Sequence, residues 1–388
     1  MTIINNIFRL SAKLYNNDLF SVYVVAYFIF TWLSMGNAIS VFYNAGISII
    51  TGHQSIIYLT LYSSTIILII IAFIKEIKSL TSKYLKIIVS SHILLLLLFV
   101  YAPPRNADAM RVWLAKIYDI VLNGEKILRP YAHYNTPDTF TLFHLPLINL
   151  GDGQIFQLSI FACFASTLIL LIRICKLYDN VYVTNTCILL FIFNPFITLG
   201  STVIISDMPL ILSFTGIMYS IAFCERDKTK AILLLFLFIA FALNIKYNSL
   251  MIVPAISIWL LLNYKSILFK KINILILLFL LVTTLNAVYP YLMNYIFIGN
   301  PVWPALTNIF PANIPNWDIA ASNLTQSYMG DERTFTNFII SIFHLLTMPH
   351  HINPIIILMI PFLFQRFKYV SFMPLIIVST YLVILWFL

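Results

Sequence analysis

The sequence predicts an all-α, polytopic membrane protein, and its composition, its hydropathy and the lengths of its apolar runs each point to this class. Hydrophobic residues make up 61% of the 388 residues, charged residues make up 10%, and the mean hydropathy is +0.93. Such values lie well outside the range of soluble domains. Several apolar runs approach the ~20 residues that an α-helix needs to cross a ~30 Å hydrocarbon core. We therefore expect a bundle of about eleven transmembrane helices.

The first hydrophobic run is too long and begins too late for a cleaved signal peptide, and it lacks a small-residue cleavage site, so we expect it to remain as the first span. The spans that we expect lie near 20–43, 55–74, 87–102, 155–174, 182–200, 208–224, 231–245, 248–263, 272–297, 352–365 and 370–388. The run 335–348 is expected to be a short interfacial helix at the outer leaflet rather than a further span.

Lysine and arginine orient these spans, because cytoplasmic loops carry an excess of both. With the N-terminus in the cytoplasm, 16 of the 23 Lys and Arg residues fall in cytoplasmic segments and seven fall outside. The net charge of +9 is therefore mainly a signal of topology, and no nucleic-acid partner is expected. We expect a multi-pass protein of the inner (plasma) membrane with its working face on the extracytoplasmic side.

The chain 1–388 reads as one integral-membrane domain without an appended soluble domain, and two outer segments, 103–154 and 298–351, are too long for simple turns. Loops of such length usually carry function. Within the first, helical spacing predicts an amphipathic surface helix over 106–122, with Asn106 as N-cap and Asn123-Gly124 as the stop. Its apolar face is formed by Val112, Trp113, Lys116, Ile117, Ile120 and Val121.

Carboxylates are concentrated in the first outer segment, which holds five of the fourteen acids of the chain: Asp108, Asp119, Glu125, Asp138 and Asp152. Solvation of an outer loop accounts for four of them. Asp108 differs because it follows directly on a hydrophobic helix, where a carboxylate stays hydrated and still reaches a lipid-linked substrate. An acid that only favours the helix dipole would occupy the same position.

Asp207 and Lys246 are charged residues at the outer ends of predicted spans. An acid at the depth of Asp207 is costly unless it is hydrated or paired, so it marks a functional site by default; a helix cap beside Pro209 is the structural alternative. Lys246 stands where the positive-inside rule disfavours a cation. It is either a lysine that extends to the interface or a cation placed for a lipid phosphate.

The remaining candidates are basic, aromatic or histidine residues of the outer segments. Arg105 and Arg111 suit bidentate phosphate contact, while the turn GNPVWP presents Trp303 either to a sugar or to the membrane interface. His144, in HLPLI, and Tyr247, beside Lys246, are further candidates for substrate contact. Adjacent histidines such as His350-His351 are a weak metal signal. We expect no protein-held metal site and no certain cofactor, although a divalent metal stays open.

These residues resemble the pattern of the GT-C superfamily of integral-membrane glycosyltransferases, in particular its protein-mannosyltransferase-like members. In that superfamily an acidic residue follows a span in the first large outer loop, an amphipathic helix comes next, and a Pro-Leu-type motif leads into the following span. Here these parts are Asp108, the helix 106–122 and HLPLI at 144–148. Three spans precede the loop instead of one, so the N-terminal pair is an addition or a variant.

The resemblance implies an inverting enzyme that moves a sugar from a polyprenyl-phosphate donor to a lipid, glycan or protein acceptor outside the cytoplasm. Asp108 and Asp207 would be the catalytic acids, and Arg105, Arg111 and Lys246 would hold the donor phosphate. His144, Tyr247 and Trp303 would contact substrate. The alternatives are an O-antigen or capsule polymerase or ligase, which would depend on loop arginines, and a lipid-linked-sugar flippase or transporter, which would place paired charges within its spans.

Overall fold

The structure, a computed structural model, describes residues 17–44, 53–104, 109–123, 139–150, 153–177, 181–268, 274–303, 306, 309–314, 336 and 340. Within these ranges the chain is helical and contains no strand, which confirms the predicted all-α class. The main helices are α2 (Phe20–Asn44), α3 (His53–Ser79), α4 (Lys83–Val100), α5 (Leu114–Asn123), α6 (Thr139–Leu142), α7 (Gln154–Leu177), α8 (Val181–Ile192), α9 (Pro195–Gly200), α10 (Asp207–Phe223), α11 (Lys228–Ile245), α12 (Ile252–Leu268) and α13 (Ile274–Ile298). Three short pieces complete the order: the π-helical turn η1 (Ala109–Trp113) and the 3-10 turns η2 (Leu145–Leu150) and η3 (Tyr247–Met251).

Six of these helices are long and apolar enough to cross a membrane, namely Phe20–Val41, Ile56–Ser79, Lys83–Val100, Gln154–Leu177, Lys228–Ile245 and Ile274–Ile298. Three shorter apolar helices, Val181–Ile192, Asp207–Phe223 and Ile252–Leu261, coincide with further predicted spans. The predicted spans 352–365 and 370–388, and almost all of the run 335–348, lie outside the described residues. A multi-pass helical protein is thus confirmed, and the count of eleven is not.

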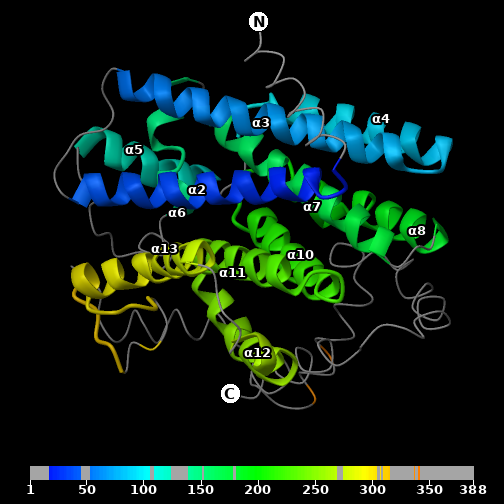
Figure 1. Ribbon diagram of the computed structural model, residues 1–388. Coiled ribbons are helices and arrows are strands. Elements are labelled where there is room, and N and C mark those ends of the chain that lie inside the picture. Colours follow the sequence, from blue (N-terminus) through cyan, green and yellow to red (C-terminus); the bar gives the residue numbers. More distant parts are fainter. Residues whose placement is uncertain are drawn as a thin grey trace, which may run out of the picture.

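α7 is the central helix of the bundle, with α3 on one side and α10 on the other (Figure 1). Of the six apolar helices it has the largest buried share, since 83% of its apolar stretch is buried inside the structure. α11 packs against α10, α13 and α2, and in this way closes the bundle around the same core. Where α10 packs against α11, a Cβ on Gly216 would lie 2.1 Å from the Phe238 ring, so the glycine permits the close approach of the two helices.

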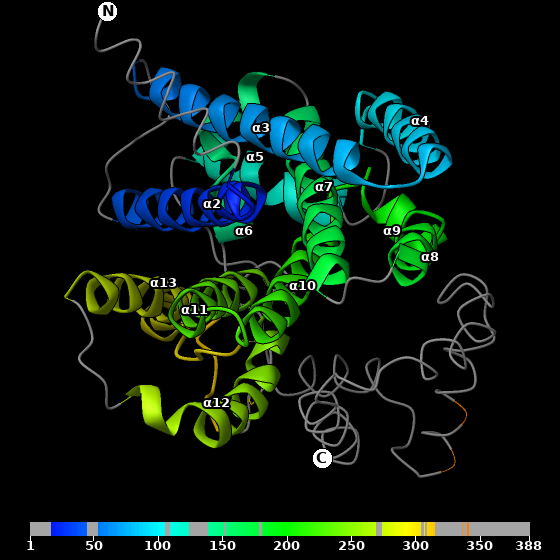
Figure 2. The ribbon, with the colours of Figure 1, turned by 45° about the vertical axis from the view of Figure 1, so that its right-hand side comes forward.

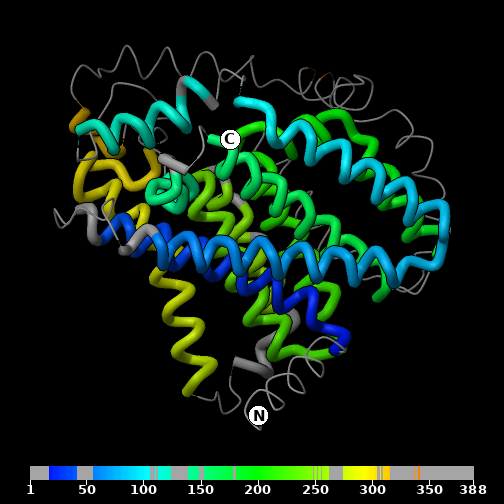
Figure 3. The backbone as a smooth tube through the Cα atoms, turned by 90° about the horizontal axis from the view of Figure 1, so that it is seen from above, coloured from blue at the N-terminus to red at the C-terminus, as the bar shows by residue number. Residues whose placement is uncertain are grey.

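α3 and α4 form a helical hairpin at the edge of the bundle. They are joined at Leu80–Ser82 and diverge from that end (Figure 3). Ser82 caps α4 by accepting a hydrogen bond of 3.2 Å from the Leu85 amide. α4 contacts α7 and α8, and Figure 2 shows α8 and α9 below it. Large apolar side chains of α4, such as Leu94 and Leu98, stay exposed.

The bundle has two ends that differ in chemistry. At one end, called the α5 end, lie α5, α6 and η2 together with the start of α7. At the other, called the Glu76 end, α3 and α7 terminate and α2 begins. The α5 end corresponds to the side that the sequence predicts to be extracytoplasmic.

The predicted span 182–200 is divided into two helices, α8 and α9, at Asn194-Pro195. Proline cannot donate a backbone hydrogen bond, and Asn194 starts the new helix by accepting hydrogen bonds from the amides of Phe196 (3.0 Å) and Ile197 (3.3 Å). The predicted span 248–263 likewise begins with the 3-10 turn η3 before α12.

Candidate active site

An ion pair between Asp207 and Lys246 lies at the α5 end. The Lys246 Nζ is 2.5 Å from the Asp207 Oδ1, and the two side chains are 38% and 36% exposed. The residues are 39 positions apart in the chain, so the packing of α10 against α11 brings them together. The sequence singled out both residues but did not predict their contact.

The local backbone explains how the two side chains meet. Lys246 is the residue at which α11 stops: its φ of −144° and ψ of 134° are extended, and its amide still donates to the Ala242 carbonyl at 3.2 Å. Asp207 is the first residue of α10, preceded by Ser206. A carboxylate in the first helical turn is favoured by the helix dipole. Asp207 is not the N-cap of the helix, and the side chain of Ser206 makes no capping hydrogen bond.

Tyr247 follows Lys246 directly and begins η3. Its side chain is partly buried, and burial raises the pKa of its phenol, so the group stays a neutral hydrogen-bond donor and acceptor at neutral pH. One acid, one ammonium and one phenol therefore lie at the point where α10 begins and α11 ends. Such a set can bind an oxyanion and orient a hydroxyl.

Helix α5 brings a further cation to this end of the bundle. The π-helical turn Ala109–Trp113 leads into α5, in which Lys116 is completely buried. A lysine is almost never fully buried without a partner, and π-helical turns are frequent at functional sites. Lys116 falls on the apolar face of the helix predicted from the sequence, and this position indicated its burial. The sequence did not lead us to predict it as a site residue.

The 139–150 segment, which comprises α6 and η2, is packed into the bundle rather than laid on its surface. Trp32 of α2 stacks on Phe140 (6.0 Å between ring centroids) and Phe143 (4.9 Å), and Trp113 meets Phe140 edge-on at 4.8 Å. These aromatic contacts fix the returning end of the first outer loop against α2 and against the start of α5.

His144 lies inside this packing with an exposed fraction of 1%. Its Nδ1 is 3.0 Å from the Phe140 carbonyl, which can only accept, so Nδ1 carries the proton and Nε2 accepts from the Ser159 hydroxyl at 2.7 Å. Burial lowers the pKa of His144 to about 3. The neutral ring has both nitrogens engaged within the chain. This geometry supports a packing role and gives no support to the predicted substrate contact.

Thr139 connects the same segment to three helices. Its hydroxyl is 2.8 Å from the Asn37 Oδ1 and 2.6 Å from the Asn244 Oδ1, and the Asn37 amide donates to the Asn286 Oδ1 at 2.7 Å. A hydroxyl has one proton, so it donates to one of the two amide oxygens at a time. Asn244 lies two residues before Lys246, so this polar cluster fixes the outer loop to the end of α11 that carries Lys246.

The turn after α13 buries Trp303, whose exposed fraction is 0% and which packs with Ile298 and Ile314. Gly299 has a φ of +81°, and a Cβ there would lie 3.0 Å from the Pro311 carbonyl oxygen. The rigid turn predicted from GNPVWP is present, but a fully buried ring offers no face to a sugar or to the membrane interface. This burial supports a packing role for Trp303 and gives no support to either predicted role.

Three predicted residues cannot be placed next to the ion pair. Arg105 and Asp108 lie outside the described residues, and Arg111 belongs to η1, where only its backbone is described. Their roles stay predictions. Within the described part of the chain no group of three or more His, Cys, Asp or Glu residues could hold a metal ion.

Residues 145–290 match a family model described as dolichyl-phosphate-mannose-protein mannosyltransferase. The match includes Asp207, Lys246 and Tyr247, and it confirms over these residues the resemblance to the GT-C glycosyltransferases. The matched segment covers less than half of the chain, and over it the chain is similar to GT-C type glycosyltransferases. Comparisons with curated proteins and with solved structures found no significant match.

Proposed function

We propose that this protein is an inverting glycosyltransferase that moves a sugar from a polyprenyl-phosphate donor to a lipid, glycan or protein acceptor on the extracytoplasmic side. The observation that carries the proposal is the Asp207–Lys246 pair at the α5 end, inside the segment that matches the mannosyltransferase family. A polyprenyl-phosphate sugar keeps its tail in lipid and its phosphate at the membrane surface. A cation at the end of a span stands at the height of that phosphate.

The proposed reaction is one displacement at the anomeric carbon. The acceptor oxygen forms a bond to that carbon while the bond to the phosphate oxygen breaks, and polyprenyl phosphate leaves with the electron pair. Asp108 takes the proton of the acceptor hydroxyl as general base. Lys246, with Arg105 and Arg111, stabilises the charge on the departing phosphate.

The ion pair gives Asp207 a positioning role in this scheme. In the free protein its carboxylate holds the flexible Lys246 side chain in one place, 2.5 Å away. A donor phosphate, which carries more acceptor oxygens, then competes with Asp207 for the ammonium. Since the two side chains are more than a third exposed, the exchange requires no buried charge to be uncovered.

Sugar transfer in membranes tests the assignment of the base. Asp108→Asn should abolish transfer at an unchanged protein level, because the amide cannot accept the proton. Asp119→Asn is the matched control: it removes a half-buried acid of the same loop, which lies on α5 and accepts a hydrogen bond of 2.9 Å from the Asn123 amide, and it should leave transfer intact. Full activity of Asp108→Asn would overturn the assignment. Tolerance at Asp108 together with loss of activity on Arg105→Ala would favour a polymerase or ligase.

A further inference from the structure

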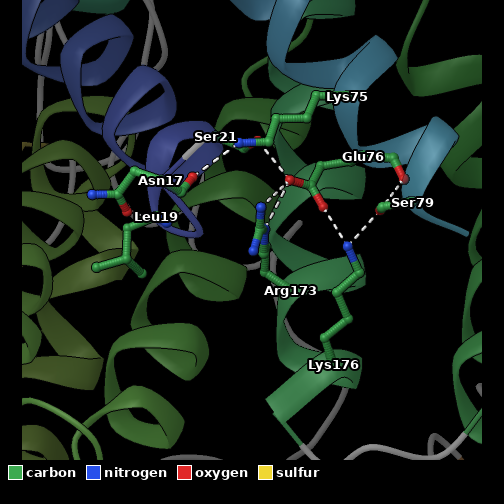
Figure 4. A network of polar contacts seen from close by, with 8 residues as sticks. All are labelled: Asn17, Leu19, Ser21, Lys75, Glu76, Ser79, Arg173 and Lys176. Carbon is green, nitrogen blue, oxygen red and sulfur yellow. Dashed lines mark hydrogen bonds and ion pairs between the residues drawn. The ribbon is translucent and has the colours of Figure 1, made fainter. Parts of the chain in front are cut away.

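A second group of charged residues lies at the Glu76 end, remote from the proposed reaction. Glu76 of α3 is completely buried, and Arg173 and Lys176 of α7 both bond to it (Figure 4). Arg173 donates from Nε to the Glu76 Oε1 at 2.8 Å, and Lys176 donates to Oε2 at 2.8 Å. Ser21 of α2 donates to Oε1 at 2.6 Å. We call Glu76, Arg173 and Lys176 the Glu76 cluster.

The cluster carries more positive charge than its carboxylate neutralises. Two cations face one glutamate, and Lys75, whose Nζ donates to the Asn17 carbonyl at 2.9 Å, adds a third on the same turn of α3. Asp18 is the other carboxylate close enough to act on Lys75. Lys75 and Asp18 carry opposite charges, and the Glu76 cluster itself has two cations and one carboxylate, so among the described residues it keeps one positive charge in excess.

The two α7 cations also keep hydrogen-bond donors that Glu76 does not use. Arg173 has five N–H groups, of which the Nε–H and one N–H on Nη2 bond to Glu76. Lys176 has three N–H groups, one on Glu76 and one on the Ser79 hydroxyl. The side chains of Arg173 and Lys176 are 13% and 32% exposed, so solvent or a ligand can reach them.

Glu76 fixes these donors in space. A guanidinium held by two bonds to a buried carboxylate cannot turn freely, and neither can an ammonium shared between a carboxylate and a hydroxyl. An anion that binds here therefore loses less side-chain entropy on binding than it would on mobile surface lysines. A phosphate suits the remaining donors, because arginine binds phosphate oxygens through its planar fork.

The position of the Glu76 cluster along the spans indicates that the phosphate belongs to a lipid headgroup. Arg173 and Lys176 lie in the last turns of the span Gln154–Leu177, and Glu76 lies in the last turn of the span Ile56–Ser79. Groups at the ends of spans stand at the level of lipid headgroups, where basic sites between transmembrane helices bind anionic lipids on the cytoplasmic side. We propose that the Glu76 cluster binds the phosphate of an anionic phospholipid, through Arg173 and Lys176, in the leaflet opposite to the reaction. This binding rests on no part of the proposed transferase activity.

Native mass spectrometry of the purified full chain tests the proposal, with phosphatidylglycerol as the probe and phosphatidylcholine as the zwitterionic comparison. The wild-type protein should retain phosphatidylglycerol in preference to phosphatidylcholine. A basic residue near an anionic lipid surface contributes about 1 kcal/mol, so Lys176→Gln should weaken phosphatidylglycerol binding by about five-fold. Lys176 is chosen because its partial exposure allows the variant to fold.

Two further variants and a soluble competitor decide the outcome. Lys228→Gln removes an exposed lysine at the start of α11, at the same end of the bundle, and should leave binding unchanged. Arg173→Lys keeps the charge, loses the fork and should weaken binding. The proposal is overturned if the wild-type protein shows no preference, if Lys176→Gln and Lys228→Gln weaken binding equally, or if inorganic phosphate displaces phosphatidylglycerol at comparable concentration.

Discussion

Replacement of Lys246 by methionine separates a catalytic cation from a structural one. The pair with Asp207 is 2.5 Å long but more than a third exposed on both sides. Solvent screens such a pair, and exposed pairs contribute about 0–1 kcal/mol to stability. Lys246→Met should therefore change the free energy of unfolding by no more than about 1 kcal/mol. Loss of a group that stabilises the leaving phosphate should instead lower kcat for sugar transfer by about 10²–10³-fold.

The assay is transfer of labelled sugar by purified protein in lipid vesicles, together with thermal unfolding in detergent. Lys230→Met is the matched control, because Lys230 forms a similar pair with Asp227, at 2.7 Å and with side chains 47% and 31% exposed, at the opposite end of the bundle. It should leave transfer unchanged. Asp207→Asn tests the positioning role of Asp207. If Asp207 acts through Lys246, the double variant with Asp207→Asn and Lys246→Met should transfer sugar no more slowly than Lys246→Met alone.

Two results would refute this reasoning. Transfer by Lys246→Met within a few-fold of the wild-type rate would show that the ammonium does not act on the reaction. A loss of several kcal/mol of stability, with transfer falling only in proportion to folded protein, would show that the pair is structural.

Three further predictions concern stability and are read as the midpoint of unfolding in detergent. Glu76→Gln should lower the free energy of unfolding by about 3–5 kcal/mol, because it leaves Arg173 and Lys176 without their buried carboxylate; a shift no larger than that of Lys230→Met would contradict this role of Glu76. Gly36→Ala should cost about 1–3 kcal/mol, since its Cβ would lie 2.6 Å from the Thr139 Cγ2 and 2.8 Å from the Thr139 carbonyl oxygen, and an unchanged midpoint would show that the 139–150 segment yields easily. The pKa of His144 is about 3 in the folded protein, against its ordinary value of 6.5. As the pH falls, the unfolded chain therefore takes up a proton at this residue before the folded protein does. The contribution of His144 to stability should therefore be complete above pH 6.5 and decline as the pH falls toward 3, and a wild-type pH dependence identical to that of His144→Gln would contradict this.

Hydropathy predicted the spans well because membrane-spanning helices need only length and apolar composition. It failed where a helix continues past its apolar run. The predicted span ended at residue 74, whereas α3 continues to Ser79, and this continuation carries Glu76 into contact with α7. Pro195 indicated a break in the helix at Asn194-Pro195, but the length of the apolar run 182–200 favoured the prediction of one continuous span.

The candidate site was predictable residue by residue but not as an arrangement. Charges at the ends of spans identified Asp207 and Lys246, since such groups are rare and costly. Their contact depends on the packing of α10 against α11, which no local pattern encodes. The burial of His144 and Trp303 was not predicted for the same reason: the long-range packing that buries them is not visible in the sequence around either residue.

The identity of the sugar donor tests most directly the central claim, that the protein transfers a sugar from polyprenyl phosphate. Purified protein in vesicles should consume a synthetic polyprenyl-monophosphate sugar and release polyprenyl phosphate as the acceptor is glycosylated, and Asp108→Asn protein should release none. Turnover of a polyprenyl-diphosphate sugar alone, or equal turnover by wild-type and Asp108→Asn protein, would contradict the account.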